Sequence, residues 1–168
     1  NIALKTTPEG VYDLNTGKEI LTVEQVNKCL NEKVAFSAHN FSFPLSEEPV
    51  VMFTKGQRRI MLDFHACRVL YDVTLPEGAV TRDFNINSRQ TAYTIGGNLY
   101  VFTANSDTLQ ISIDGSTDGS DNIVYGQSVH RDEFGIHKGT FWSNDGQKLA
   151  FYRMDQSMVT DYPQVNTF

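Results

Sequence analysis

Short runs in which apolar and polar residues alternate, separated by turn residues, make up most of this chain. Six of them have the length and the Val, Ile, Leu, Tyr and Phe content of β-strands. They span residues 50–53, 59–64, 68–73, 91–95, 99–102 and 109–113. The tight turn Gly96-Gly97-Asn98 separates two of these runs, and residues 55–57 separate another pair. The pattern predicts antiparallel strands of a sandwich, a barrel or a propeller.

The first thirty or so residues differ from the rest. Residues 11–14 read as a short strand that runs into a turn at 15–18. In residues 22–30, Thr22 can cap a helix with Gln25 three positions later, and an apolar face follows, formed by Val23, Val26 and Leu30. We therefore expect one short helix here.

An internal repeat selects among the β architectures. Residues 84–93 align without gaps on residues 142–151, and each copy has an aromatic residue, a polar turn and a strand that ends in Ala-aromatic. Their offset fits a propeller blade once a loop insertion is allowed. Residues 41–53 form a weaker third copy. We predict an all-β, partial β-propeller of about three four-stranded antiparallel blades over residues 36–168, preceded by an N-terminal segment, 1–35, with one short helix.

Composition narrows the class of partner. The net charge of −6, with no basic patch to offset it, argues against nucleic acid. No apolar run has the length of a membrane span. The chain begins at Asn1, from which we expect that a leader or an upstream segment has been removed.

The chain has two cysteines, Cys29 and Cys67, without metal-ligand spacing. They are compatible with a disulfide. Free cysteine is often buried, however, and residue type alone favours the alternative of two separate small buried side chains.

Three catalytic or metal-binding patterns between residues 114 and 137 do not meet the requirements of their chemistry. Ser128, His130 and Asp132 share a strand face, but such positions lie roughly 6.5–7 Å apart, and no Gly-x-Ser-x-Gly elbow is present. Residues 114–121 resemble the start of a calcium loop, but Tyr125 stands where the bidentate carboxylate is needed. His130 and His137 could share a metal with Asp132 or Glu133, but no further ligand stands at a recognisable spacing. We expect no metal and no cofactor.

A charged segment, Arg131-Asp132-Glu133, precedes the second copy of the repeat. A carboxylate at a cavity wall can hold an ammonium group by a charge-assisted hydrogen bond. The alternative, a solvated acidic pair beside Arg131, is favoured by residue type alone. Arg58 or Arg59 can bind a carbonyl or a carboxylate, against the alternative of a solvated strand edge.

At these residues the chain resembles the propeller domain of the dipeptidyl peptidase IV family of prolyl oligopeptidase-type serine peptidases, in particular its bacterial, Bacteroides-like members and the prolyl tripeptidyl peptidases. The resemblance is carried by residues 125–136 (YGQSVHRDEFGI), 138–143 (KGTFWS), 149–155 (LAFYRMD), 157–159 and 161–163. Residues 98–101 fit the preceding blade, and residues 1 to about 45 match only loosely.

The resemblance implies a function in substrate recognition. In that family an acidic stretch inserted in an early blade binds the free α-amine of a peptide, and an α/β-hydrolase domain carries the catalytic triad. It points to Glu133 for the amine, with Asp132 and Arg131 beside it, and to Arg58 or Arg59, of which we take Arg59, for the substrate carbonyl. Animal members have a run of glutamates where this chain has Arg131-Asp132-Glu133.

The resemblance thus implies the gating and N-terminus-recognition part of a proline-specific dipeptidyl or tripeptidyl exopeptidase, with no catalytic residue in this chain. Its expected partners are a peptide with a free N-terminus and a C-terminal α/β-hydrolase domain. The parent enzyme is expected to be a homodimer that is periplasmic or secreted. The alternative is a non-catalytic, propeller-like binding or scaffold protein.

Overall fold

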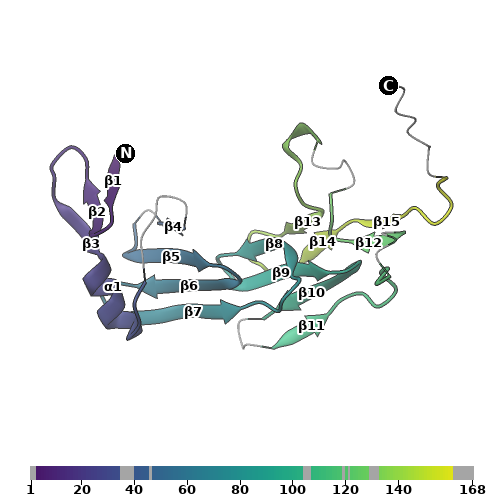
Figure 1. Cartoon of the computed structure of the whole chain (residues 1–168), viewed down its shortest axis with the longest axis horizontal. Coiled ribbons are helices and arrows are strands. Elements are labelled where there is room, and N and C mark those ends of the chain that lie inside the picture. Colours follow the sequence, from purple (N-terminus) through teal and green to yellow (C-terminus); the bar gives the residue numbers. More distant parts are fainter. Residues whose placement is uncertain are drawn as a thin grey trace, which may run out of the picture. The chain divides into compact units, whose positions relative to one another are not determined.

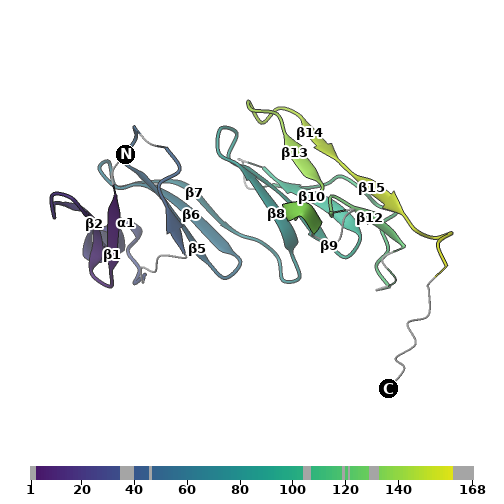
Figure 2. The same cartoon turned by 90° about the horizontal axis from the view of Figure 1, so that it is seen from above.

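The computed structural model describes residues 3–34, 40–45, 47–103, 107–118, 120, 122–128 and 133–160. Contacts divide the chain into two compact units, Asn1–Glu77 and Gly78–Phe168, called the N-terminal and C-terminal units below. Both are built from antiparallel sheets, as Figures 1 and 2 show. The division expected from the sequence at residue 35 follows composition rather than contacts, and it stays a prediction.

The N-terminal unit contains two sheets and a helix. A three-stranded sheet has the order β1-β2-β3, and a four-stranded sheet has the order β4-β5-β6-β7. The elements are β1 (Leu4–Thr7), β2 (Gly10–Asp13), β3 (Glu19–Thr22), α1 (Val23–Leu30), β4 (Phe41–Ser42), β5 (Val50–Lys55), β6 (Arg58–Asp63) and β7 (Arg68–Thr74). Each strand and the helix expected here from the sequence is confirmed to within two residues.

Helix α1 begins where the sequence predicts. The Thr22 hydroxyl accepts a hydrogen bond from the Gln25 backbone N–H at 3.1 Å, and Asn31 ends the helix in the left-handed conformation. Val26 is fully buried and packs in one cluster with strand residues such as Leu21 and Ile60. The apolar face of the helix therefore contributes to the core of this unit. Among the described residues no helix is long and apolar enough to cross a bilayer.

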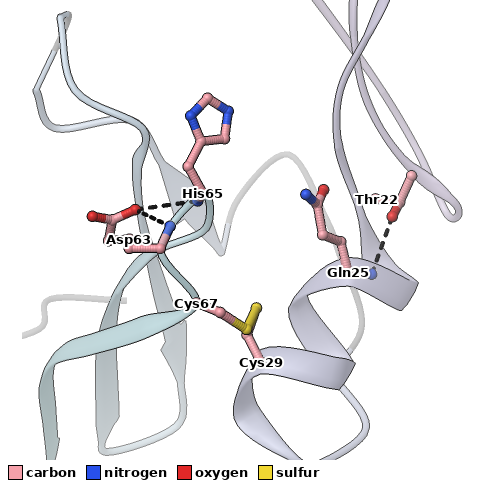
Figure 3. The surroundings of a disulfide bond; sticks show 7 residues. Thr22, Gln25, Cys29, Asp63, His65 and Cys67 are labelled. Carbon is pink, nitrogen blue, oxygen red and sulfur yellow. Dashed lines mark hydrogen bonds between the residues drawn. A yellow bond between two sulfur atoms is a disulfide. The ribbon is translucent and has the colours of Figure 1, made fainter.

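The two cysteines form a disulfide, with Cα atoms 5.0 Å apart. Figure 3 shows it joining the last turn of α1 to the turn between β6 and β7. The preference for two separate thiols is therefore wrong. The β6–β7 hairpin places Cys67 beside α1, and a separation of 38 residues in sequence does not reveal this proximity.

The C-terminal unit begins with a four-stranded sheet of order β11-β10-β9-β8. Its core includes Ala92, Leu99, Val101 and Tyr125. The elements are β8 (Val80–Asn85), β9 (Gln90–Ile95), β10 (Asn98–Phe102), β11 (Thr108–Gln110), β12 (Ile123–Tyr125), the 3-10 helix η1 (Glu133–Gly135), β13 (Thr140–Trp142), β14 (Leu149–Phe151) and β15 (Arg153–Asp155).

Strand β11 ends three residues earlier than expected, because the Ser112 side chain takes part in other hydrogen bonds. Its hydroxyl accepts the Leu99 N–H at 3.0 Å and donates to Asn98 Oδ1 at 3.1 Å. A side chain that satisfies the neighbouring backbone in this way competes with regular strand pairing.

The predicted repeat corresponds to a repeated hairpin. Residues 84–93 cover the end of β8, its turn and most of β9, and residues 142–151 cover the end of β13, its turn and β14. The weaker copy falls on β4 and β5, the first two strands of the other four-stranded sheet. Each copy is therefore a hairpin of the same kind.

Candidate functional site

The site is built on a strand that is interrupted by a loop. β12 pairs with β15, from Ile123 opposite Asp155 to Tyr125 opposite Arg153. β13 pairs with β14, from Thr140 opposite Phe151 to Trp142 opposite Leu149. β14 and β15 follow each other directly, so β12 and β13 lie end to end along one edge. Residues 127–138, named the excursion here, leave this edge and return to it.

Three backbone hydrogen bonds close the base of the excursion. Gly126 N–H donates to Tyr152 O at 2.9 Å, Tyr152 N–H donates to Gly139 O at 2.8 Å, and Gly139 N–H donates to Gly126 O at 3.0 Å. Gly126 has a φ of 65°, and a Cβ on Gly139 would collide with the Gln127 carbonyl. We call Gly126 and Gly139 the neck. The two glycines let the chain leave the strand at Gly126 and rejoin it at Gly139, where the two residues are joined by a backbone hydrogen bond.

The described part of the excursion projects from the strands just before β13 (Figure 1). Inside it, the Ser128 hydroxyl donates to the Ile136 carbonyl at 2.7 Å. Its tip carries η1, in which Phe134 has a φ of 56° and is 89 % exposed. The excursion is thus a cross-braced loop that holds a short helical turn above the sheet.

The buried Asp83 of β8 anchors the return end of the excursion. Its carboxylate accepts Lys138 Nζ at 2.7 Å and Thr140 Oγ1 at 2.9 Å, and its backbone carbonyl accepts Trp142 Nε1 at 3.0 Å. The carboxylate is surrounded by donors, which is what a buried charge requires. These bonds tie the last residues of the excursion and all of β13 to the preceding sheet.

Equivalent turns of the two hairpins are also in contact. Asn85 Nδ2 donates to the Ser143 carbonyl at 3.1 Å, and Asn87 Nδ2 donates to the Asn144 carbonyl at 2.7 Å. The partners lie 58 and 57 residues apart, within one residue of the offset of 58 between residues 84–93 and 142–151. Successive repeats therefore lie side by side.

A second polar cluster fixes the strand on the other side of the neck. Tyr125 OH donates to Asp114 Oδ1 at 2.6 Å, and Arg153 donates to Tyr125 OH at 2.9 Å and to Asp114 Oδ2 at 3.1 Å. The Tyr125 and Arg153 donors hold the pKa of Asp114 below its ordinary value, and the Asp114 carboxylate raises the pKa of Tyr125. Asp114 begins the calcium-like segment, so this carboxylate already has donors within the protein. Within the ranges described above, no three His, Cys, Asp or Glu residues are placed to hold a metal.

Of the predicted amine-binding residues, Glu133 is the first residue of η1, on the excursion. Arg131, Asp132 and His130 lie outside the described residues, so of the rejected triad the structure describes Ser128. In sequence, Glu133 thus lies near the middle of the excursion, seven residues after Gly126 and six residues before Gly139.

The two arginines of the N-terminal unit have different surroundings. Arg58 pairs with Asp72 through Nε and Nη2, both at 2.7 Å, and with Glu32 through Nη1 at 2.6 Å. The hydrogen bonds from Asp72 and then Glu32 raise the pKa of Arg58 further above its ordinary value. Arg59 lies on β6 opposite Thr54 and Val73. Arg58 serves the unit internally, and the role of Arg59 expected from the resemblance stays a prediction.

Asp83, Lys138 and the neck were not among the residues predicted from the sequence. Residue type gave no signal for them, because a lone Asp in a strand and a Lys beside Gly139 are common. The repeat offset held the useful information: added to position 83, it leads to position 141, between the residues that Asp83 contacts.

Comparisons with known proteins agree with this architecture. A family model described as the dipeptidyl peptidase IV N-terminal region matches residues 64–167. A crystal structure from Bacteroides ovatus, described as a dipeptidyl aminopeptidase IV, superposes on 95 % of this chain with a TM-score of 0.76 and 38 % identity. The structure of Porphyromonas gingivalis dipeptidyl peptidase 4 covers 96 % of the chain with a TM-score of 0.55 and 18 % identity, and it supports the fold alone.

Curated relatives match in a shorter region. A Talaromyces stipitatus protein named as a dipeptidyl-aminopeptidase B is 35 % identical over 97 residues, which are 55 % of this chain and 10 % of that protein. The Talaromyces marneffei counterpart is 33 % identical over 93 residues, 52 % of this chain and again 10 % of that protein. The chain also covers 22 % of the Bacteroides ovatus structure and 26 % of the Porphyromonas gingivalis one. It therefore corresponds to a small part of each relative.

The expected fold class is confirmed: the chain is mostly antiparallel strand with one short helix, and its neighbours share the N-terminal propeller region. The family model covers well over half of the residues, and the sheets superpose on a 38 % identical structure. The chain belongs to the dipeptidyl peptidase IV N-terminal region family.

Proposed function

We propose that this chain is the substrate-gating and N-terminus-recognition part of a proline-specific dipeptidyl or tripeptidyl exopeptidase. The observation that supports it most is the excursion itself. A loop with a closed neck, anchored to a sheet, carries Glu133 in a family whose named relatives are dipeptidyl peptidases. Functional side chains commonly lie on such loops above rigid strands.

In this proposal Glu133 binds the α-ammonium group of the peptide. A carboxylate and an ammonium group form a charge-assisted hydrogen bond, which gains strength where water is excluded. A fixed distance from this carboxylate to a distant reaction centre would count the residues released. Asp132 and Arg131 lie beside it in the sequence, and Arg59 contributes a donor to a substrate carbonyl.

Bond cleavage belongs, in the same proposal, to a C-terminal α/β-hydrolase domain with which this chain acts. The parent enzyme is a homodimer that is periplasmic or secreted. The Cys29–Cys67 disulfide supports the export of the chain, because disulfides persist mainly in oxidising compartments.

The proposal predicts that Glu133→Gln weakens the use of substrates with a free amine. In the enzyme that joins this chain to its peptidase domain, kcat/KM for Gly-Pro-p-nitroanilide should fall by about 30-fold, which corresponds to ~2 kcal/mol for a lost charge-assisted bond. Glu133→Asp should recover part of the loss. Glu19→Gln, at an exposed carboxylate of β3, is the matched control and should change nothing.

The discriminating comparison uses an N-acetylated peptide with the same scissile bond. Its kcat/KM should respond little to Glu133→Gln, since it has no ammonium group to bind. If the acetylated and the free peptide lost activity equally, the role proposed for Glu133 would be wrong.

A further inference from the structure

A carboxylate that measures a peptide must be held in place relative to the sheet that carries it. The excursion contains twelve residues and is attached to the sheets at its neck, through Gln127 Nε2, which donates to the Gly96 carbonyl at 3.3 Å, and through Lys138. A displacement of a binding group by about 1 Å can cost up to ~100-fold in rate. The attachment at the return end of the excursion, the Lys138–Asp83 pair, therefore matters for function.

We infer that Asp83 and Lys138 are positioning residues, which fix the excursion and with it Glu133 relative to the sheet. This inference rests on the proposed function for its kinetic consequence, but the anchoring itself does not depend on that function. Lys138 lies five residues after Glu133 and is the last residue of the excursion. Its ammonium group, 2.7 Å from Asp83 Oδ1, attaches the loop to a strand of the preceding repeat.

Asp83 is suited to be the fixed end of this pair. Strand β8 has a register shift between Val80 and Asp83, with Thr81 at a φ of 48°, and regular pairing with β9 resumes at Asp83. Such bulges re-aim the side chains that follow them. The Asp83 side chain is only 11 % exposed and also accepts Thr140 Oγ1. The Asp83 carboxylate is thus oriented by the bulge in its own strand and held by the Thr140 hydroxyl.

Because Lys138 is partly exposed, its role in positioning can be tested apart from its contribution to global stability. Its side chain is 45 % exposed, so removing it leaves no cavity in the core, and the cost falls on the Asp83 carboxylate, which is 11 % exposed and loses one donor. Thr140 and Trp142 continue to bind Asp83 when the lysine is absent. Loss of Lys138 should therefore loosen the excursion and leave the sheets intact.

The first experiment tests the anchoring in this 168-residue chain. Amide hydrogen exchange should become about tenfold faster in peptides that cover residues 127–138 in Lys138→Met, and stay unchanged in β9 and β10. Lys138→Arg should keep the wild-type rates. Lys148→Met, at an exposed lysine in the β13–β14 turn, is the matched control. Unchanged exchange in the excursion of Lys138→Met would overturn the inference.

Asp83→Asn provides a second variant, since it removes the charge and keeps the shape. It should loosen the excursion to a similar degree. An increase of exchange throughout the C-terminal unit in both variants would show a purely structural role and would also overturn the inference.

The second experiment measures kinetics in the peptidase-bearing enzyme. Lys138→Met should raise KM for Gly-Pro-p-nitroanilide by about tenfold with little change in kcat, and should leave an N-acetylated substrate unaffected. If Glu133→Gln affects the free amine and Lys138→Met does not, the positioning role fails alone. If Glu133→Gln has no effect, the proposed function fails, and the exchange experiment still decides the anchoring.

Discussion

Tyr125 takes part both in the buried core and in a cluster of charged side chains. Its ring belongs to the buried cluster with Ala92 and Leu99, and its hydroxyl lies between Asp114 and Arg153. The Arg153 guanidinium carbon lies 5.7 Å from the ring centroid. One side chain therefore joins the core of the unit to the strand that ends at the neck.

We expect the pKa of Tyr125 to lie above its ordinary value of 10.0, chiefly because of the Asp114 carboxylate. A raised folded pKa stabilises the protein fully below pH 10, and this contribution is lost as the pH rises through the folded pKa. Asp114 has the opposite sign: its pKa is lowered from 3.8, so its contribution is present above that pH and is lost in stronger acid.

Titration of the tyrosinate by NMR or by ultraviolet absorbance measures this shift. In Asp114→Asn the pKa of Tyr125 should fall, whereas Asp118→Asn, in the same loop, should leave it unchanged. An Asp114→Asn variant with the wild-type Tyr125 titration would show that the hydrogen bond does not persist in solution.

Helices and strands whose position depends on neighbouring residues in the sequence could be predicted, whereas strands whose position depends on pairing with distant residues could not. Helix α1 follows from the Thr22 cap and its apolar face, and β5, β6 and β9 follow from alternation within six residues. β12 and β13 are three residues each and become one edge only through β14 and β15. Glu133 is a candidate by resemblance and stays a prediction, while the Asp83–Lys138 pair depends on a contact across 55 residues.

The neck has a strict sequence requirement at Gly139. Gly139→Ala places a Cβ against the Gln127 carbonyl, and the backbone has to move to relieve the collision. We expect a loss of about 1–3 kcal/mol in the free energy of unfolding, typical of strain at a constrained backbone position.

Urea denaturation followed by the fluorescence of Trp142, the only tryptophan, measures this loss. Gly135→Ala is the comparison variant, because its Cβ would meet no neighbour, although its φ of 73° also strains an alanine. Equal losses in the two variants would mean that the close approach at Gly139 contributes nothing beyond backbone strain.

At the scale of the whole molecule, the two units differ in how they are held together. The disulfide lies in the N-terminal unit, where it closes a separation of 38 residues and joins α1 to the β6–β7 turn. The C-terminal unit depends instead on hydrogen bonds between successive repeats. Reducing conditions should therefore act on the first unit.

The disulfide should stabilise the N-terminal unit by about 4 kcal/mol in the loop-entropy model. After reduction, or in Cys29→Ser/Cys67→Ser, amide exchange should accelerate in α1 and β6–β7, with β9 and β10 unaffected. The same reductant should do nothing further to the double variant. Equal acceleration in both units would contradict this assignment.

The neck also bears on how recognition can change in evolution. Because β12 pairs with β15 and β13 pairs with β14, the strand pairing on either side of the neck does not use residues 127–138. A lineage can lengthen, shorten or rewrite residues 127–138 while the pairing beneath them stays the same. Under the proposed function, selectivity can therefore diversify while the strand pairing is kept, and a protein engineer who exchanges this segment has two graft points, Gly126 and Gly139.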